Sequence, residues 1–167
     1  MYLTCSRGHH HWGTSGAAGA VLVAPGERAP QVLLTLRSPR VHQGSTWSTP
    51  GGAIDAGEDA RTAACREVSE ELGLSVDGLP VIGEHVFECG GWAYTTVLLA
   101  APHASGLTAL GWETDEVRWF GIDEVDRLTH LHPSFAASWP ALRKLVQASG
   151  AQAGGVPAGA AVDRAAG

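Results

Sequence analysis

The chain lacks any long uninterrupted apolar run. No stretch approaches the roughly 20 residues that a membrane-spanning helix needs. The opening residues, MYLTCSRGHHHWG, do not place an apolar stretch behind a basic end, as an export signal would. We therefore expect no membrane association and a cytoplasmic protein.

Cysteine is scarce as well. Cys5, Cys65 and Cys89 make an odd number with no short paired spacing, which is unlike a disulfide framework. Ordinary thiols in a reducing compartment are the simpler interpretation. Cys5 with His9–His11 suggests zinc only weakly, because the spacing matches no standard ligand pattern and adjacent histidines do not easily converge on one ion.

Positive charge is also in short supply. The formal net charge is −6, so a long polyanion is repelled on average, and the sequence shows no basic patch to overcome that repulsion. We expect no binding to long nucleic acids. A small phosphorylated ligand remains compatible with this charge, because a bound metal ion can supply positive charge locally.

The length of 167 residues corresponds to about one ordinary domain. From Ser149 to Gly167 the chain reads SGAQAGGVPAGAAVDRAAG, a run of small residues without a periodic apolar face. Nothing in that run offsets the entropy lost on ordering it. We predict a single domain over 1–148 and a flexible Ala/Gly-rich tail over 149–167.

Apolar periodicity predicts both strands and helices. Gly19–Ala24 and Gln31–Leu36 have strand-like composition and are separated by PGERAP, a turn that joins neighbouring strands. Apolar residues recur every four positions from about Asp59 to Leu72, and Gly73 follows, which predicts a helix that ends there. Later patterns predict strands over 81–88, 93–101 and 117–120, and helices over 123–128 and 134–148.

Strands precede, separate and follow the helices without strict alternation. This order indicates a mixed sheet flanked by helices, in the α/β or α+β class.

Three carboxylates fall on one face of the predicted helix over 59–72. Glu67, Glu70 and Glu71 stand at i, i+3 and i+4, so like charges crowd together. Hard oxygen ligands of this kind suit Mg²⁺ or Mn²⁺, which would relieve the repulsion. The alternative is a solvated acidic face with Arg61 and Arg66 as ordinary ion-pair partners.

The surrounding pattern favours the metal. Residues 52–74, GAIDAGEDARTAACREVSEELGL, resemble the Nudix box, Gly-x5-Glu-x7-Arg-Glu-U-x-Glu-Glu-x-Gly-U, where U is a bulky apolar residue. Every defined position is matched, by Gly52, Glu58, Arg66, Glu67, Val68, Glu70, Glu71, Gly73 and Leu74. The order of elements from about Gly16 to Val146 is also similar to the α/β/α sandwich of that MutT-like family, with a mixed central sheet.

The resemblance implies a role for each box residue. Glu67, Glu70 and Glu71 would hold Mg²⁺ or Mn²⁺, joined by the carbonyl of Gly52. Glu58 and Arg66 would form an ion pair that fixes the loop against the helix, and Gly73 would be structural. We call residues 52–74 the box.

The implied reaction is attack of a metal-activated water on a diphosphate linkage of a nucleoside diphosphate joined to another group. Glu67 and Glu70 are the candidate catalytic residues within the box. Glu116 is a candidate outside it, because the family often places an extra acidic residue ahead of a strand there. Glu113 and Asp115 compete with Glu116 for that role.

Arg37 stands at the end of a predicted strand, where a Nudix arginine often contacts substrate phosphate, and Arg40 is a second candidate. Either could instead be a surface charge. Trp47 precedes the PGG turn, and we interpret it as packing rather than base stacking.

The resemblance leaves the substrate open among nucleoside triphosphates, ADP-sugars and dinucleotides, with the small size favouring triphosphates. Two other functions are compatible with the fold. One is a non-catalytic nucleotide sensor, although such proteins typically lose box carboxylates. The other is a prenyl diphosphate isomerase, which would need a Cys and a Glu facing an apolar pocket, as Cys89 beside Glu88 faintly suggests. A homodimer is common among relatives.

Overall fold

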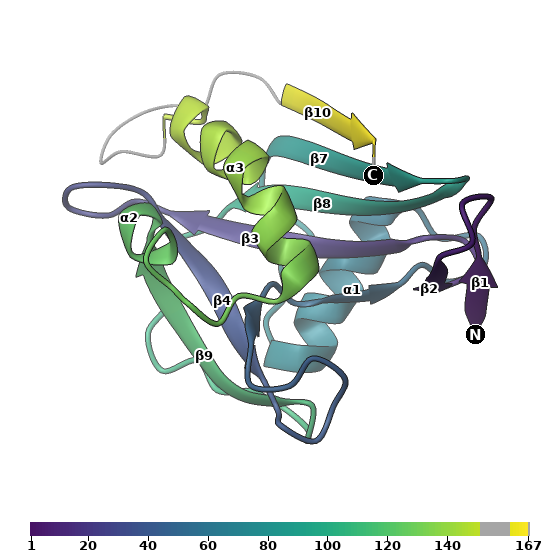
Figure 1. Ribbon diagram of the computed structural model, residues 1–167. Coiled ribbons are helices and arrows are strands. Elements are labelled where there is room, and N and C mark those ends of the chain that lie inside the picture. Colours follow the sequence, from purple (N-terminus) through teal and green to yellow (C-terminus); the bar gives the residue numbers. More distant parts are fainter. Residues whose placement is uncertain (151–160, 167) are drawn as a thin grey trace.

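The computed structural model describes residues 1–150 and 161–166 of the chain (Figure 1). Its elements in chain order are β1 (Tyr2–Thr4), β2 (His10–Trp12), β3 (Ala17–Ala24), β4 (Gln31–Arg37), β5 (Trp47–Ser48), β6 (Gly51–Ala53), α1 (Ala60–Leu72), β7 (Val81–Cys89), β8 (Trp92–Ala100), β9 (Thr114–Gly121), α2 (Ile122–Val125), α3 (Pro133–Ala148) and β10 (Ala161–Ala166).

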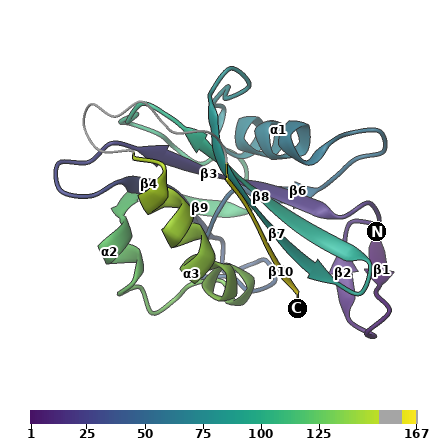
Figure 2. The same ribbon diagram turned by 90° about the horizontal axis from the view of Figure 1, so that it is seen from above.

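The elements form three layers around one mixed sheet. Its strand order is β10-β7-β8-β3-β4-β5, with β6 also paired to β3 and β9 to β4. β3 runs parallel to β8 and antiparallel to β4, and β7 runs antiparallel to β8. Figure 2 shows α1 over one face of the sheet and α2 and α3 over the other. The predicted mixed sheet between helices is confirmed.

The central strand β3 carries the core on both faces. All eight of its residues are buried. Leu22 packs with Val68 of α1, whereas Val21 and Val23 pack on the opposite face with Leu142 of α3. Each such side chain contributes about 1.5–3 kcal/mol by leaving water. Consecutive residues of a strand point to opposite faces, so one buried strand holds both helical layers.

Helix α1 is capped at both ends, and it ends before Gly73 as the sequence predicts. The carboxylate of Asp59 accepts a hydrogen bond from the backbone N–H of Thr62 at 2.7 Å. Gly73 takes the left-handed conformation, with φ of 64°, and its N–H donates to the carbonyl of Ser69. The buried face comprises Ala63, Ala64, Cys65, Val68 and Leu72.

The structure departs from the predicted elements at several places. The short strands β5 and β6 were not predicted, and α2 ends at Val125 rather than at 128. The N-terminal hairpin of β1 and β2 was not predicted, and β9 begins at Thr114 rather than at 117. Residues 151–160 and 167 of the predicted tail lie outside the described residues. Within that tail, β10 pairs in parallel with β7, where the sequence predicts no regular structure.

Helix length also bears on membrane association. None of the helices within 1–150 combines the length and the apolarity that crossing a bilayer would take.

Candidate functional site

Strand β6 brings the start of the box against helix α1. Gly51 and Gly52 pair antiparallel with Gly19 and Ala18 of β3. A Cβ atom at Gly52 would lie 2.7 Å from the carboxyl carbon of Glu67, closer than real Cβ atoms come to any neighbour. A side chain at position 52 would therefore force the Glu67 carboxylate to move away from the β6 backbone.

Arg66 ties the loop after β6 to the helix. Its Nε and Nη2 donate to the two carboxylate oxygens of Glu58 at 3.1 and 3.0 Å, and Nη2 also donates to the carbonyl of Ala53 at 2.9 Å. The hydrogen-bonded guanidinium lowers the pKa of Glu58. The two side chains are only 26% and 11% exposed, so this bidentate pair is largely shielded from water.

Arg66 also contacts the two carboxylates that follow it. Its Nη1 donates to Glu67 Oε1 at 2.8 Å and to Glu70 Oε2 at 3.4 Å. Burial raises the pKa of Glu67, although Arg66 acts in the opposite direction. Glu70 is far more open, with 60% of its side chain exposed. The family resemblance pairs Arg66 with Glu58, whereas the structure hydrogen-bonds it to three carboxylates and places a fourth, that of Asp55, 3.8 Å from its Nε.

Glu71 is the most enclosed of the three ligand candidates. The backbone N–H of Gly51 donates to its Oε1 at 3.1 Å, and the hydroxyl of Thr114 donates to its Oε2 at 3.4 Å. Burial raises the pKa of Glu71 to about 7, and the negative charge of Glu67 acts in the same direction. Within the described residues no cationic side chain forms an ion pair with it, so its charge is poorly compensated.

The three box carboxylates differ in their exposure to solvent. Glu71 is half-buried against β6 and β9, Glu67 lies against Gly52, and Glu70 faces solvent. Their oxygen atoms are hard donors of the kind that divalent cations such as Mg²⁺ or Mn²⁺ prefer.

The two arginines outside the box differ in placement. Arg37, the last residue of β4, is half-buried, and its guanidinium donates twice to the carbonyl of His42, at 3.2 and 3.1 Å. Its charge nevertheless lowers the pKa of Glu71, so it lies near the carboxylates. Arg40 is exposed in the following loop, where its backbone N–H contacts Ser38.

The acidic candidates on β9 are not drawn into the box. Glu113, Asp115 and Glu116 are all exposed. Glu116 stands opposite Leu36, while Thr114 pairs with Arg37, because a bulge interrupts the register between them. The side chain of Glu116 forms no hydrogen bond or ion pair with another described residue. The bulge instead directs Thr114 to Glu71, a contact that the strand pattern did not predict.

Tyr94 is a further residue near the site that the sequence did not single out. Burial raises the pKa of Tyr94 to about 12; the charges of Glu71 and Glu67 act in the same direction, and a hydrogen bond with Thr49 acts against them. Its hydroxyl lies against Gly19 and Gly51. The residue belongs to β8, which is far from the box in sequence, so no spacing could have indicated it.

Trp47 packs as the sequence analysis expects. Its ring meets Phe120 edge-on at 4.8 Å between centroids, and the Arg118 guanidinium lies 5.8 Å from its centre. It contacts the core cluster beneath α3.

Comparisons with known proteins match most of the chain to one family. A family model described as “NUDIX domain” matches residues 13–144. A Mycobacterium tuberculosis protein named “Putative 8-oxo-dGTP diphosphatase 3” is 43% identical over 149 residues, which cover 85% of this chain and 68% of that protein. The mouse “Oxidized purine nucleoside triphosphate hydrolase” is 32% identical over 115 residues, which cover 66% of this chain and 67% of that protein.

A solved structure agrees as well. The M. smegmatis Nudix hydrolase RenU superposes with a TM-score of 0.79 at 38% identity, covering 87% of this chain and 93% of that one. With the family model spanning most of the chain and the complete box in place, the chain belongs to the Nudix hydrolase family.

Proposed function

We propose that this chain is a Mg²⁺- or Mn²⁺-dependent pyrophosphohydrolase of nucleoside triphosphates, with oxidised purine nucleoside triphosphates as its substrate class. The observation that carries the proposal is the half-buried carboxylate of Glu71. It is held by Gly51 and Thr114, burial raises its pKa to about 7, and no cationic side chain of the described residues forms an ion pair with it. A purely structural carboxylate at this depth would be expected to have a charged partner.

The donor set fits a divalent cation. Glu67, Glu70 and Glu71 offer only oxygen atoms, and they range from half-buried to exposed, so one side remains open to substrate phosphate and water. When bound, the cation supplies Lewis acidity and neutralises charge that develops on the phosphate oxygens. Arg66 would compete with it for Glu67 and Glu70 while remaining paired with Glu58.

Residues of the chain supply the other roles. Glu67 is our candidate for the base that accepts the proton of the attacking water, because burial raises its pKa and thereby its basicity. Glu116 is the alternative base and stands on exposed β9. Arg37 lies close enough to influence Glu71 and could turn from the carbonyl of His42 to a substrate phosphate.

Two observations support the substrate class. The relatives from M. tuberculosis and mouse are both named for oxidised purine nucleotides, and this chain covers about two thirds of each. The three cysteines form no disulfide, which agrees with a reducing cytoplasm, where nucleotide pools are found and where we place the protein.

The isomerase alternative loses its main support. The sulfur of Cys89 lies 3.6 Å from that of Cys5 and 3.1 Å from His9 Nδ1, and so belongs to a different cluster. Because Cys89 lies in that other cluster, it cannot serve as the protonating cysteine that an isomerase site at the box would need.

The test is a substrate panel with Mg²⁺ or Mn²⁺, comparing the native chain with Glu70→Gln and with the surface control Glu27→Gln. The panel contains 8-oxo-dGTP, dGTP, ADP-ribose, a dinucleoside tetraphosphate and a prenyl diphosphate. Products are separated by chromatography, and pyrophosphate is detected with and without inorganic pyrophosphatase.

We expect 8-oxo-dGTP to give the monophosphate and pyrophosphate with the native chain and Glu27→Gln, and no turnover with Glu70→Gln. Preference for ADP-ribose or the tetraphosphate would overturn the substrate class. Equal turnover by all three proteins, or binding without hydrolysis, would overturn the assignment of the box.

A further inference from the structure

The N-terminal hairpin is a small unit with few contacts of its own. β1 and β2 share three residue pairs and form a two-stranded sheet separate from the central one. Such a hairpin is marginally stable alone in water. Its apolar support is a minor cluster formed mainly by Cys5, Ala17, Cys89 and Trp92. The hairpin therefore needs contacts beyond its own strand pairing to stay in one position.

The hairpin lies against the turn that joins β7 to β8. The backbone N–H of Ser6 donates to the carbonyl of Gly90 at 2.9 Å, and Trp92 Nε1 donates to the carbonyl of Gly13 at 3.0 Å. The ring of His11 stacks on Trp92, with centroids 4.2 Å apart. Segments more than 75 residues apart in sequence therefore converge here.

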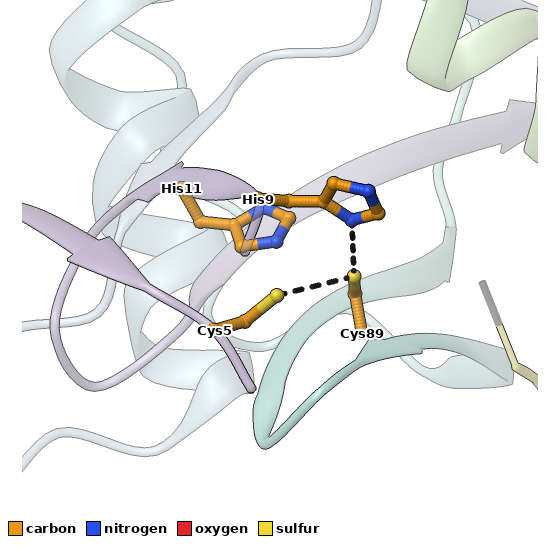
Figure 3. Close-up of side chains that lie close together, drawn as sticks. All are labelled: Cys5, His9, His11 and Cys89. Atoms are coloured by element: carbon orange, nitrogen blue, oxygen red, sulfur yellow. Dashed lines mark hydrogen bonds between the residues drawn. The ribbon is translucent and has the colours of Figure 1, made fainter. Parts of the chain in front are cut away.

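Four ligand-type side chains meet at this contact. Cys5, His9 and His11 come from the hairpin and Cys89 from the end of β7, and Figure 3 shows them turned toward one another. We call them the hairpin cluster. One donor atom from each lies within 4.8 Å of every other. Both cysteines are buried, and Nε2 of His11 is buried without a hydrogen-bond partner among the described residues.

The distances match a shared ion better than a covalent bond. The two sulfur atoms are 3.6 Å apart, and His9 Nδ1 lies 3.1 Å from Cys89 Sγ. A disulfide requires about 2.05 Å between sulfur atoms. In tetrahedral zinc, with Zn–S near 2.3 Å and Zn–N near 2.0 Å, neighbouring donor atoms are about 3.3–3.8 Å apart.

Strand geometry explains why the histidines converge. His9 and His11 are two residues apart at β2, so they project to the same side, whereas His10 projects to the other side and contacts Thr4 Oγ1 at 2.9 Å. The objection that adjacent histidines cannot share an ion therefore applies to His10 alone. The fourth donor, Cys89, is too distant in sequence to reveal itself by spacing.

We propose that Cys5, His9, His11 and Cys89 bind one Zn²⁺ ion that fastens the N-terminal hairpin to the β7–β8 turn. Two sulfur and two nitrogen donors suit zinc rather than Mg²⁺ or Mn²⁺. Four protein ligands fill a tetrahedral shell and leave no position for substrate, so the role is structural. The site is separate from the box and does not depend on the proposed function.

The test uses full-length protein without a histidine tag, dialysed against metal-depleted buffer, with zinc per chain measured by mass spectrometry. The variants are Cys89→Ser and His11→Asn. Their matched controls are Cys65→Ser, a buried cysteine on α1, and His10→Asn, the histidine between the two ligands. Glu67→Gln reports whether any zinc is held by the box.

We expect about one zinc ion per native chain, the same in the three controls, and loss of zinc in Cys89→Ser and His11→Asn. Should Cys89→Ser fail to fold, replacement of zinc by Co²⁺ in the native chain gives an independent readout. Tetrahedral thiolate coordination then produces visible absorption and sulfur-to-cobalt charge-transfer bands. Zinc-free native protein, a mass two hydrogens lower that reports a Cys5–Cys89 disulfide, zinc lost with Glu67→Gln, or octahedral Co²⁺ spectra would each overturn the proposal.

Discussion

The box and the hairpin cluster gather their side chains in opposite ways. The box takes its three carboxylates from two turns of one helix, at spacings visible in the sequence. The hairpin cluster takes its donors from two segments that only the folded sheet brings together. The box offers hard oxygen atoms and leaves Glu70 open to solvent, whereas the cluster offers sulfur and nitrogen atoms that face inward. An open site suits turnover, and a closed one suits anchoring.

Glu67→Gln should have the largest effect, because it should lower kcat at the box and leave the zinc content of the hairpin cluster unchanged. Loss of a charged box oxygen that also serves as the candidate base should lower kcat by about 10²–10⁴. The surface variant Glu27→Gln should retain native kcat. Both are measured by pyrophosphate release from 8-oxo-dGTP, with zinc content measured on the same samples. Native kcat in Glu67→Gln would move the base to Glu116 or another group.

Arg66→Gln should destabilise the box by removing the hydrogen bonds that hold its loop against α1. The substitution removes the bidentate bond to Glu58 and the bond to the carbonyl of Ala53, leaving Glu58 largely buried without a charged partner. We expect a loss of about 3 kcal/mol in the free energy of unfolding, below the full cost for a buried pair because Arg66 is partly exposed. Urea unfolding measures it. Arg61→Gln, on the exposed side of α1, is the control, and an equal loss there would contradict this role.

The pKa of Glu71 predicts how the metal-free protein responds to pH. The pKa of Glu71 is about 7 in the folded chain and 4.5 when unperturbed. Between these two pH values the folded chain therefore keeps a proton that the unfolded chain has released. The contribution of Glu71 to the free energy of unfolding is therefore fully present below pH 4.5, and it is lost as the pH rises through 7. The loss is about 2 kcal/mol after allowing for screening.

Urea unfolding at several pH values, in chelator, measures this loss. Glu71→Gln should flatten the dependence, and use of the same chelator for both proteins cancels any effect of the hairpin cluster. An unchanged pH slope in Glu71→Gln would show that another group titrates.

Asp59→Ala should have the smallest effect. The variant removes the side-chain oxygen that caps α1 at the N–H of Thr62, which costs about 1 kcal/mol. Thermal unfolding measures it, and Asp59→Asn should recover most of the loss. Zinc content should not change. A much larger loss, or loss of zinc, would mean that the helix start and the hairpin are coupled.

The sequence predicts well what is encoded within one element. The end of α1 at Gly73 and its acidic face follow from short spacings, and the structure shows both of them. Partners that arrive from other strands could not be predicted, because their approach depends on sheet order and register. Thr114 reaches Glu71 only through the bulge in β9, and Cys89 reaches His9 only because β7 ends beside the hairpin.

Binding of Mn²⁺, followed by the loss of its free-ion electron paramagnetic resonance signal, tests most directly whether the box holds the catalytic cation. We compare the native chain, Glu67→Gln and Cys89→Ser. Glu67→Gln should bind Mn²⁺ far more weakly than the native chain, while Cys89→Ser should bind it as the native chain does. Undiminished binding by Glu67→Gln, or loss of binding in Cys89→Ser alone, would contradict the assignment of hydrolysis to the box and of anchoring to the hairpin cluster.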